Sequence, residues 1–175
     1  MATYDDWDER TRPLGFLITF RTYGTWLHGD ERHSVDRHDH LNVYGFPDWA
    51  PNSKLKGRMR ENLIHKPTIF DIERRDVVKA AIEEVCDFRK YPLHAINVRS
   101  NHVHAAVSSL DRPETVAEVF KRYSTRKLRK DGYFDSQVKI WSRGCSTRYL
   151  WNEKHLGLAI EYVLYGQGDE LFAFE

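Results

Sequence analysis

The chain has little cysteine and no long apolar run. Its two cysteines, Cys86 and Cys145, provide neither a disulfide framework nor the spacing of a metal site, which fits a reducing compartment. The apolar stretch from Leu14 to Phe20 is far too short to cross a membrane. The residues from Met1 to Arg12 are charged and acidic, unlike a signal peptide. We therefore expect a cytoplasmic protein.

Neither sign of charge dominates the chain, but basic residues are concentrated in one segment. The 175 residues carry a formal net charge of +1, which by itself predicts no partner. The segment 121–130 reads KRYSTRKLRK, with six basic residues and no acidic one. Such a segment is either a phosphate-contacting surface or the solvated face of a helix, and the sequence leaves both open.

The hydrophobic pattern predicts one folded domain over residues 1–175. An apolar fraction of 41% and an aromatic fraction of 13% suffice for a core. Alternation and helical periods predict a strand at 15–22, a helix at 71–90, strands at 93–99 and 102–108, a helix opened at 111–114, a strand at 147–151 and a helix at 153–165. Residues 23–67 are polar and rich in histidine, so we expect a functional insertion there or short elements of its own.

The order of these elements predicts the fold class. Strand, helix, hairpin, helix, strand and helix fit an α+β protein, with a ferredoxin-like or RRM-like antiparallel sheet and packed helices. The strand at 102–108 should lie in the middle of that sheet. Asp111 to Glu114 resembles a capping box with an early proline, and Gly166 is a common type of helix end.

The stretch Asn101-His102-Val103-His104 is the most informative local pattern. Alternate side chains of a strand share a face, so His102 and His104 point the same way, with Cα atoms roughly 7 Å apart. Two neutral imidazoles on one face can hold a metal ion and leave positions open for a substrate. A short His-x-His also arises by chance. His38-Asp39-His40 has the same spacing, but it lies in a polar, turn-rich stretch, so we interpret it as a loop.

The last predicted helix carries two tyrosines, Tyr162 and Tyr165. A phenol is a poor nucleophile at neutral pH, because its ordinary pKa is about 10. Beside a metal-polarised phosphate it can nevertheless attack phosphorus and form a covalent ester. The alternative is that these are packed helix tyrosines with their hydroxyls at the surface.

These motifs, in this order, resemble the HUH single-tyrosine transposases. The resemblance rests on the NHVH strand, the basic helix after it, Ile140-Trp-Ser-Arg-Gly144, and the helix that ends in YVLYGQ at 162–167. It extends from about Gly15 to Gln167. The family comprises small transposases of insertion sequences and the REP-associated tyrosine transposases. The opening GFLITFRTYGTWLHGDER and the stretch NVRSNHVH resemble a bacterial branch of it.

The resemblance implies an activity and its site residues. His102 and His104 would bind Mg²⁺ or Mn²⁺, of which Mn²⁺ suits imidazole better. Tyr162 would attack a phosphodiester of single-stranded DNA, form a 5′-phosphotyrosine link and release a 3′-hydroxyl. Relatives commonly carry a glutamine ligand four residues after the tyrosine. Here Gly166 has that place and Gln167 follows it, so Gln167 is the expected third ligand. Tyr165 is the alternative nucleophile.

The resemblance also implies that the protein binds single-stranded DNA that carries hairpins, and that it acts as a monomer or a homodimer. The helix residues expected to contact the DNA backbone are Lys121, Arg122, Arg126, Lys127 and Arg129, and those expected to hold the scissile phosphate or a hairpin stem are Arg143 and Arg148. The aromatic residues that can stack on unpaired bases are Trp26, Tyr44, Phe46, Trp49 and Trp141. Core packing and surface charge are the alternatives.

Two other functions compete with strand transfer. A ferredoxin-like sheet with a basic helix would suffice for a non-catalytic, domesticated nucleic-acid-binding module. A phosphoesterase with two His-x-Thr/Ser motifs is disfavoured, because Ala105 and Ala106 follow His104 and no second matching pair occurs in a strand.

Overall fold

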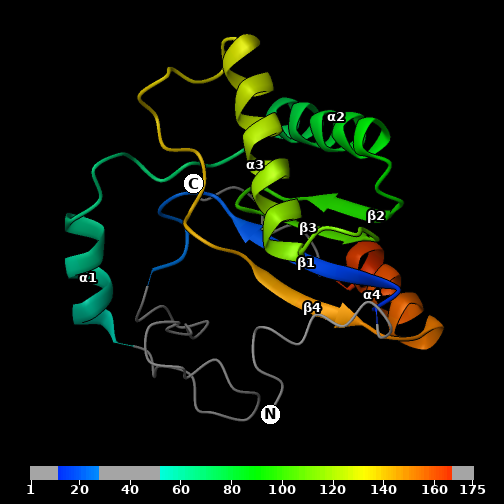
Figure 1. Cartoon of the computed structure of the whole chain (residues 1–175). Coiled ribbons are helices and arrows are strands. Elements are labelled where there is room, and N and C mark those ends of the chain that lie inside the picture. Colours follow the sequence, from blue (N-terminus) through cyan, green and yellow to red (C-terminus); the bar gives the residue numbers. More distant parts are fainter. Residues whose placement is uncertain (1–11, 28–51, 167–175) are drawn as a thin grey trace.

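The computed structural model describes residues 12–27 and 52–166. Figure 1 shows its helices and strands, coloured along the sequence, and the strands form one sheet. Their bounds are β1 Gly15–Arg21, α1 Ser53–Glu61, α2 Ile72–Arg89, β2 Leu93–Val98, β3 His102–Val107, α3 Pro113–Lys130, β4 Ser146–Leu150 and α4 Glu153–Tyr165. None of these helices is long and apolar enough to cross a membrane.

The sheet has the strand order β2-β3-β1-β4, and every neighbouring pair is antiparallel. This is the order of a ferredoxin-like βαββαβ unit, formed here by β1, α2, β2, β3, α3 and β4. The predicted fold class is therefore confirmed, and β3 is one of the two inner strands as expected.

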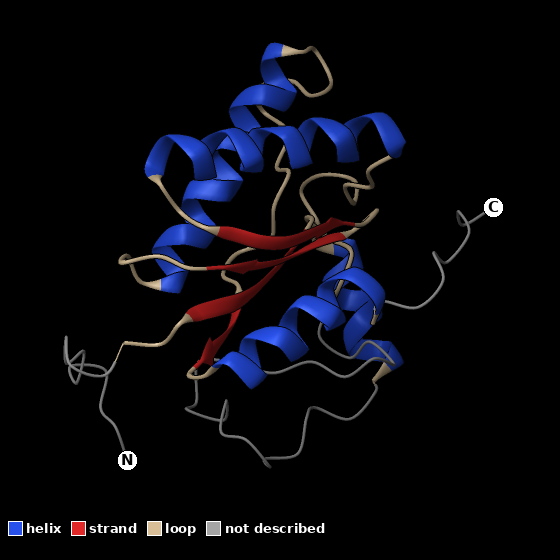
Figure 2. Cartoon of the chain, turned by 90° about the vertical axis from the view of Figure 1, so that its right-hand side faces the viewer, coloured by secondary structure: helices blue, strands red, loops and turns tan. Residues whose placement is uncertain are grey.

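Alternation along the strands gives the sheet two different apolar faces. Phe16, Ile18 and Phe20 belong to the large core, which also contains most of the buried apolar side chains of α2 and α3. Ala106 on β3 belongs to a second, smaller cluster with Val163 of α4. Figure 2 shows the sheet with helices on both sides. α4 therefore covers the face opposite α2 and α3.

The start of α3 differs from its predicted form. Its N-cap is Arg112, which makes no side-chain capping hydrogen bond, so the predicted capping box is wrong. The two acidic side chains of the predicted capping box have other partners. Asp111 accepts a hydrogen bond from the hydroxyl of Tyr91, and Glu114 accepts one from the Thr147 hydroxyl at 3.2 Å. Pro113 at the first helical position is as expected.

The polar segment predicted at 23–67 carries an element of its own, α1. Asn52 caps this helix by accepting a hydrogen bond from the Leu55 amide at 3.0 Å. Residues 28–51 lie outside the described part of the chain, and with them the pair His38 and His40 and the aromatic residues Tyr44, Phe46 and Trp49.

Candidate active site

The two histidines of β3 lie on the sheet face that α4 covers. They alternate with Val103, which is fully buried in the large core on the other face. His104 is 6% exposed, whereas His102, at the strand end, is half-buried. Their ring centroids are 4.6 Å apart and the ring planes are nearly perpendicular, at 79°. The strand therefore brings the predicted pair together on one face.

Each ring is hydrogen-bonded through Nδ1. Nδ1 of His102 lies 2.6 Å from Oδ1 of Asn101, the residue before it. Nδ1 of His104 lies 2.7 Å from Oγ1 of Thr19, its partner across the strand pair β1–β3. The sequence reasoning missed Thr19, because only the strand register identifies it as a neighbour of His104.

The helix α4 brings Tyr162 to this face. Asn152 caps its start by accepting from the His155 amide at 2.9 Å, and Ala159 and Val163 are buried against the sheet. One position before Val163, the ring of Tyr162 meets that of His104 edge to face, with centroids 5.5 Å apart. Tyr162 remains 44% exposed, although its ring contacts that of His104. Tyr165 is 82% exposed and extends into solvent.

The end of α4 is packed closely around Tyr162. Gly166 donates its amide to the Tyr162 carbonyl at 3.0 Å. A Cβ on Gly166 would lie 2.8 Å from Cδ2 of the Tyr162 ring, which is closer than real contacts allow. This position therefore has no room for a side chain unless the tyrosine shifts. Gln167, the expected third ligand, lies outside the described residues.

The separation of the two imidazoles fits one octahedral ion. Two rings that bind an ion through Nε2 at about 2.2 Å, with about 90° between them, have centroids roughly 4.5–5 Å apart. The observed separation is 4.6 Å. Over residues 12–27 and 52–166, no group of three or more His, Cys, Asp and Glu side chains converges on a metal site. His102 and His104 would thus supply two ligands and leave the other positions for substrate, water or a further side chain.

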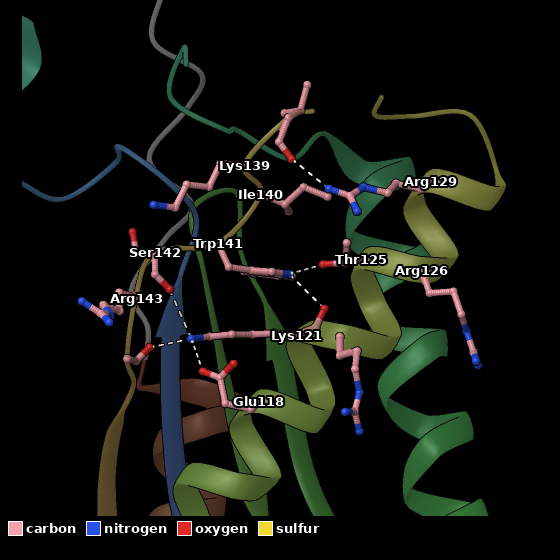
Figure 3. A pocket seen from close by; sticks show the side chains of 13 residues that line it. Glu118, Lys121, Thr125, Arg126, Arg129, Lys139, Ile140, Trp141, Ser142 and Arg143 are labelled. Carbon is pink, nitrogen blue, oxygen red and sulfur yellow. Dashed lines mark hydrogen bonds and ion pairs between the residues drawn. The ribbon is translucent and has the colours of Figure 1, made fainter. Parts of the chain in front are cut away.

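A basic cavity of about 860 Å³ lies between α3 and the segment that leads into β4 (Figure 3). Its lining residues are Glu118, Lys121, Arg122, Thr125, Arg126, Arg129, Val138, Lys139, Ile140, Trp141, Ser142, Arg143 and Gly144. Four of the arginines expected to contact DNA therefore surround one cavity. Arg148 is separate from them, because its register partner on β1 is Leu17, which packs in the cluster under α4. Lys127 is half-buried and does not line the cavity.

Lys121 has a different environment from the one expected of a phosphate contact. Its ammonium group is buried and lies 2.7 Å from the Gly144 carbonyl, 3.2 Å from the Ser142 carbonyl and 3.0 Å from the Glu118 carboxylate. These acceptors match its three hydrogens. The indole of Trp141 is also fixed, because it donates to Lys121 O and Thr125 Oγ1. Both side chains therefore hold the 138–144 segment against α3 (Figure 3).

Comparison with known proteins assigns the family. Residues 63–157 match the family model described as "Transposase IS200 like", which is more than half of the chain. The match includes the histidine pair and ends before Tyr162. By class, the protein is a transposase. It belongs to the IS200-like family of single-tyrosine transposases.

Two solved structures are similar to this chain at low identity. One is a putative transposase from Deinococcus radiodurans R1, with 11% identity, a TM-score of 0.49, and coverage of 94% of this chain and 96% of that one. The other is a REP-associated tyrosine transposase bound to a REP hairpin, with 13% identity, a TM-score of 0.45, and coverage of 93% and 70%. No curated protein sequence matches the chain.

Proposed function

We propose that this transposase cuts and rejoins single-stranded DNA through a 5′-phosphotyrosine link to Tyr162, at a divalent metal site formed by His102 and His104. The observation that carries the proposal is the contact of the Tyr162 ring with the His104 ring, at 5.5 Å between centroids. It brings a phenol beside a pair of imidazoles spaced for one ion. Membership of a transposase family supplies the substrate class.

The chemistry follows from these side chains. The Tyr162 oxygen attacks phosphorus and loses its proton to solvent, a new P–O bond forms, and the bond to the 3′-oxygen of the preceding nucleotide breaks. That oxygen takes up a proton and leaves as a 3′-hydroxyl. Bound Mn²⁺ or Mg²⁺ supplies Lewis acidity toward a phosphate oxygen. Rejoining is the reverse attack by a 3′-hydroxyl and needs no ATP, because the ester bond to tyrosine keeps the energy of the bond that was broken.

One chain contributes all three side chains in this arrangement. His102, His104 and Tyr162 come from β3 and α4 of the same molecule, and α4 packs on its own sheet. We therefore propose that a monomer is competent for cleavage. Mixing His102→Ala/His104→Ala protein with Tyr162→Phe protein tests this, and no activity should return. Restored cleavage would mean that tyrosine and histidines act across a dimer.

The basic cavity is the proposed contact for the DNA backbone. Arg122, Arg126 and Arg143 are exposed around it, and guanidinium groups bind phosphates without regard to base sequence. Arg129 also donates to the carbonyls of Ser136 and Val138, at 2.8 Å and 3.2 Å, so it shapes the wall of the cavity as well. A hairpin stem presents two phosphate backbones to such a surface.

A covalent adduct tests the proposal directly. The protein is incubated with Mn²⁺ and a pool of labelled single-stranded oligonucleotides in which randomised bases flank a hairpin. We expect a protein–DNA adduct that survives denaturation, disappears in Tyr162→Phe, and persists in Tyr165→Phe, the matched control three residues along the same helix. The opposite pattern for the two tyrosines would contradict the assignment of the nucleophile.

The same experiment separates the enzyme from a non-catalytic binding module. EDTA should abolish the adduct, and Mn²⁺ should restore it. Binding of the oligonucleotides that is indifferent to EDTA, with no adduct in any metal, would contradict cleavage and favour a domesticated nucleic-acid-binding protein.

A further inference from the structure

We propose that Asn101 and Thr19 are positioning residues, which hold both imidazoles as Nδ1–H tautomers with Nε2 turned toward the ion. The inference rests on the metal site of the proposed function, but it concerns the state of the rings before any metal or DNA binds. Its test therefore gives an answer whether or not the protein forms a covalent adduct.

The contact between Asn101 and His102 selects the tautomer of His102. The atom that faces Nδ1 at 2.6 Å is the amide oxygen of Asn101, which can only accept a hydrogen bond. Nδ1 must therefore carry the hydrogen. In a neutral imidazole the lone pair is then on Nε2, the nitrogen that would bind a cation.

The backbone of Asn101 is itself held in place by the end of β1. Its carbonyl oxygen accepts hydrogen bonds from the amide and the hydroxyl of Thr22, at 2.9 Å and 3.1 Å, and from the hydroxyl of Thr25 at 3.5 Å. Thr22 is fully buried. Asn101 therefore approaches His102 from a fixed position, although it lies in the short turn between β2 and β3.

Thr19 has the corresponding place beside His104. It lies opposite His104 in the register of β1 and β3, and its hydroxyl oxygen is 2.7 Å from Nδ1. Since the His104 ring is 6% exposed and meets Tyr162 on another side, rotation of the ring would disturb both contacts. A hydroxyl can accept or donate, so this contact fixes the ring but not by itself the tautomer. We assign Nδ1–H to His104 because an ion between the two rings would need the Nε2 lone pair.

Another histidine of the chain provides an internal comparison. His94, at the start of β2, is bonded through Nε2, which lies 2.8 Å from the hydroxyl of Ser108. His102 and His104 are thus bonded through the other ring nitrogen from the one that His94 uses. Outer partners that orient ligating histidines typically change metal affinity by about 10–100-fold when they are removed.

Histidine ¹⁵N NMR of the metal-free protein at a pH where the rings are neutral tests the tautomers, with the His94 signals as reference. We expect the Nδ1–H pattern at His102 and His104. Asn101→Ala should increase the population of the Nε2–H tautomer at His102, and Thr19→Val should increase it at His104. Nε2–H signals at both rings in the unsubstituted protein would overturn the proposal.

Mn²⁺ binding followed by electron paramagnetic resonance gives the second readout. Asn101→Ala and Thr19→Val should weaken it about 10–100-fold. Thr19→Ser keeps the hydroxyl and should stay near the unsubstituted protein, Asn101→Asp keeps an acceptor and with its added negative charge should bind Mn²⁺ at least as tightly, and Asn62→Ala at the end of α1 serves as a distant control. Mn²⁺ affinities of Asn101→Ala and Thr19→Val that both lie within twofold of that of the unsubstituted protein would also overturn the proposal. If Thr19→Val fails to fold, the pair Asn101→Ala and Asn101→Asp decides alone.

Discussion

The side-chain amide of Asn97 donates a hydrogen bond to the backbone carbonyl of Val163, at 3.0 Å. This bond joins β2 to the last turn of α4, one residue after Tyr162. Carbonyls in the last turn of a helix have no partner within the helix, and Asn97 supplies one. Because Asn97 is also the register partner of His104, the residue beside the histidine holds the helix that carries the tyrosine.

Removing the hydrogen bond from Asn97 to Val163 should make the position of Tyr162 less fixed, although the tyrosine itself is not substituted. We predict that Asn97→Ala destabilises the protein by about 1 kcal/mol, since a carbonyl loses its partner. It should also reduce adduct formation several-fold, because the end of α4 is no longer tied to the sheet. Urea unfolding and the adduct assay measure the two effects. Asn52→Ala, which removes the N-cap of α1, should cost a similar stability and leave the adduct unchanged.

Gly166 should be required for activity because of the room that it leaves for Tyr162. Gly166→Ala places a Cβ 2.8 Å from the Tyr162 ring and 3.0 Å from the Cα and carbonyl oxygen of Tyr162, so both the ring and the end of the helix must shift. We predict a several-fold lower rate of adduct formation and a lower melting temperature, although the backbone φ of −84° itself suits alanine. Gly157→Ala is the matched control, since nothing lies within 4 Å of its Cβ. It should stabilise α4 by about 1 kcal/mol and leave the rate unchanged. Equal rates in the two variants would contradict the packing argument.

Lys121 should act as a structural residue. Lys121→Met leaves the carbonyls of Ser142 and Gly144 without the ammonium group, and we predict a loss of about 2 kcal/mol in the free energy of unfolding. Lys130→Met, at the exposed end of the same helix, should change it by less than about 0.5 kcal/mol. Chemical denaturation of both variants decides between the structural role and a direct phosphate contact.

The exposed arginines should determine how DNA binding depends on salt. Each phosphate contact that is lost lowers the slope of log K against log salt by about 0.7 for single strands and about 0.9 for duplex. Arg126→Gln and Arg143→Gln should each show such a decrease with hairpin oligonucleotides. Lys79→Gln on α2, which does not line the cavity and pairs with Glu83, should leave the slope unchanged. A similar decrease in all three would mean that binding is not localised at the cavity.

The buried Cys86 should respond to alkaline pH. Burial, aided by Asp87 and Glu83, raises the pKa of its thiol from 9.0 to about 12. The folded state therefore keeps a proton that the unfolded chain loses above pH 9. The free energy of unfolding falls as the pH rises from 9.0 to about 12. Relative to Cys86→Ala, we predict a loss of about 1 kcal/mol between pH 8 and pH 10 by urea unfolding. Cys86 should also resist iodoacetamide at pH 8 until the protein is unfolded.

Most of the fold could be predicted from hydrophobic periodicity. The bounds expected for α4 agree with the structure, and those for β1, β2, β3 and α2 differ by about one residue. The order of elements predicted the fold class and an inner place for the strand at 102–108, as the structure has it, whereas the full strand order came with the structure. The capping box failed because Asp111 and Glu114 have partners from elsewhere in the fold, Tyr91 and Thr147, which no local motif reveals.

The site was predictable only where its residues are local in sequence. His102 and His104 share a face through strand alternation alone. Thr19 and Asn97 became visible only with the strand register, and the burial of Lys121 only with the path of the 138–144 segment. Gly166 was expected as an ordinary helix end, but its lack of a side chain is required by the Tyr162 ring. The roles of Tyr162, the two histidines and the arginines stay predictions until the experiments above are done.

The place of α4 after every strand affects when the protein can become active. During synthesis, the four strands and the histidine face leave the ribosome before Tyr162 does. A nascent chain can therefore pair these strands before Tyr162, the proposed nucleophile, reaches them. Docking of the last helix, secured by Asn97, is the step at which the newly made protein would acquire the ability to break DNA.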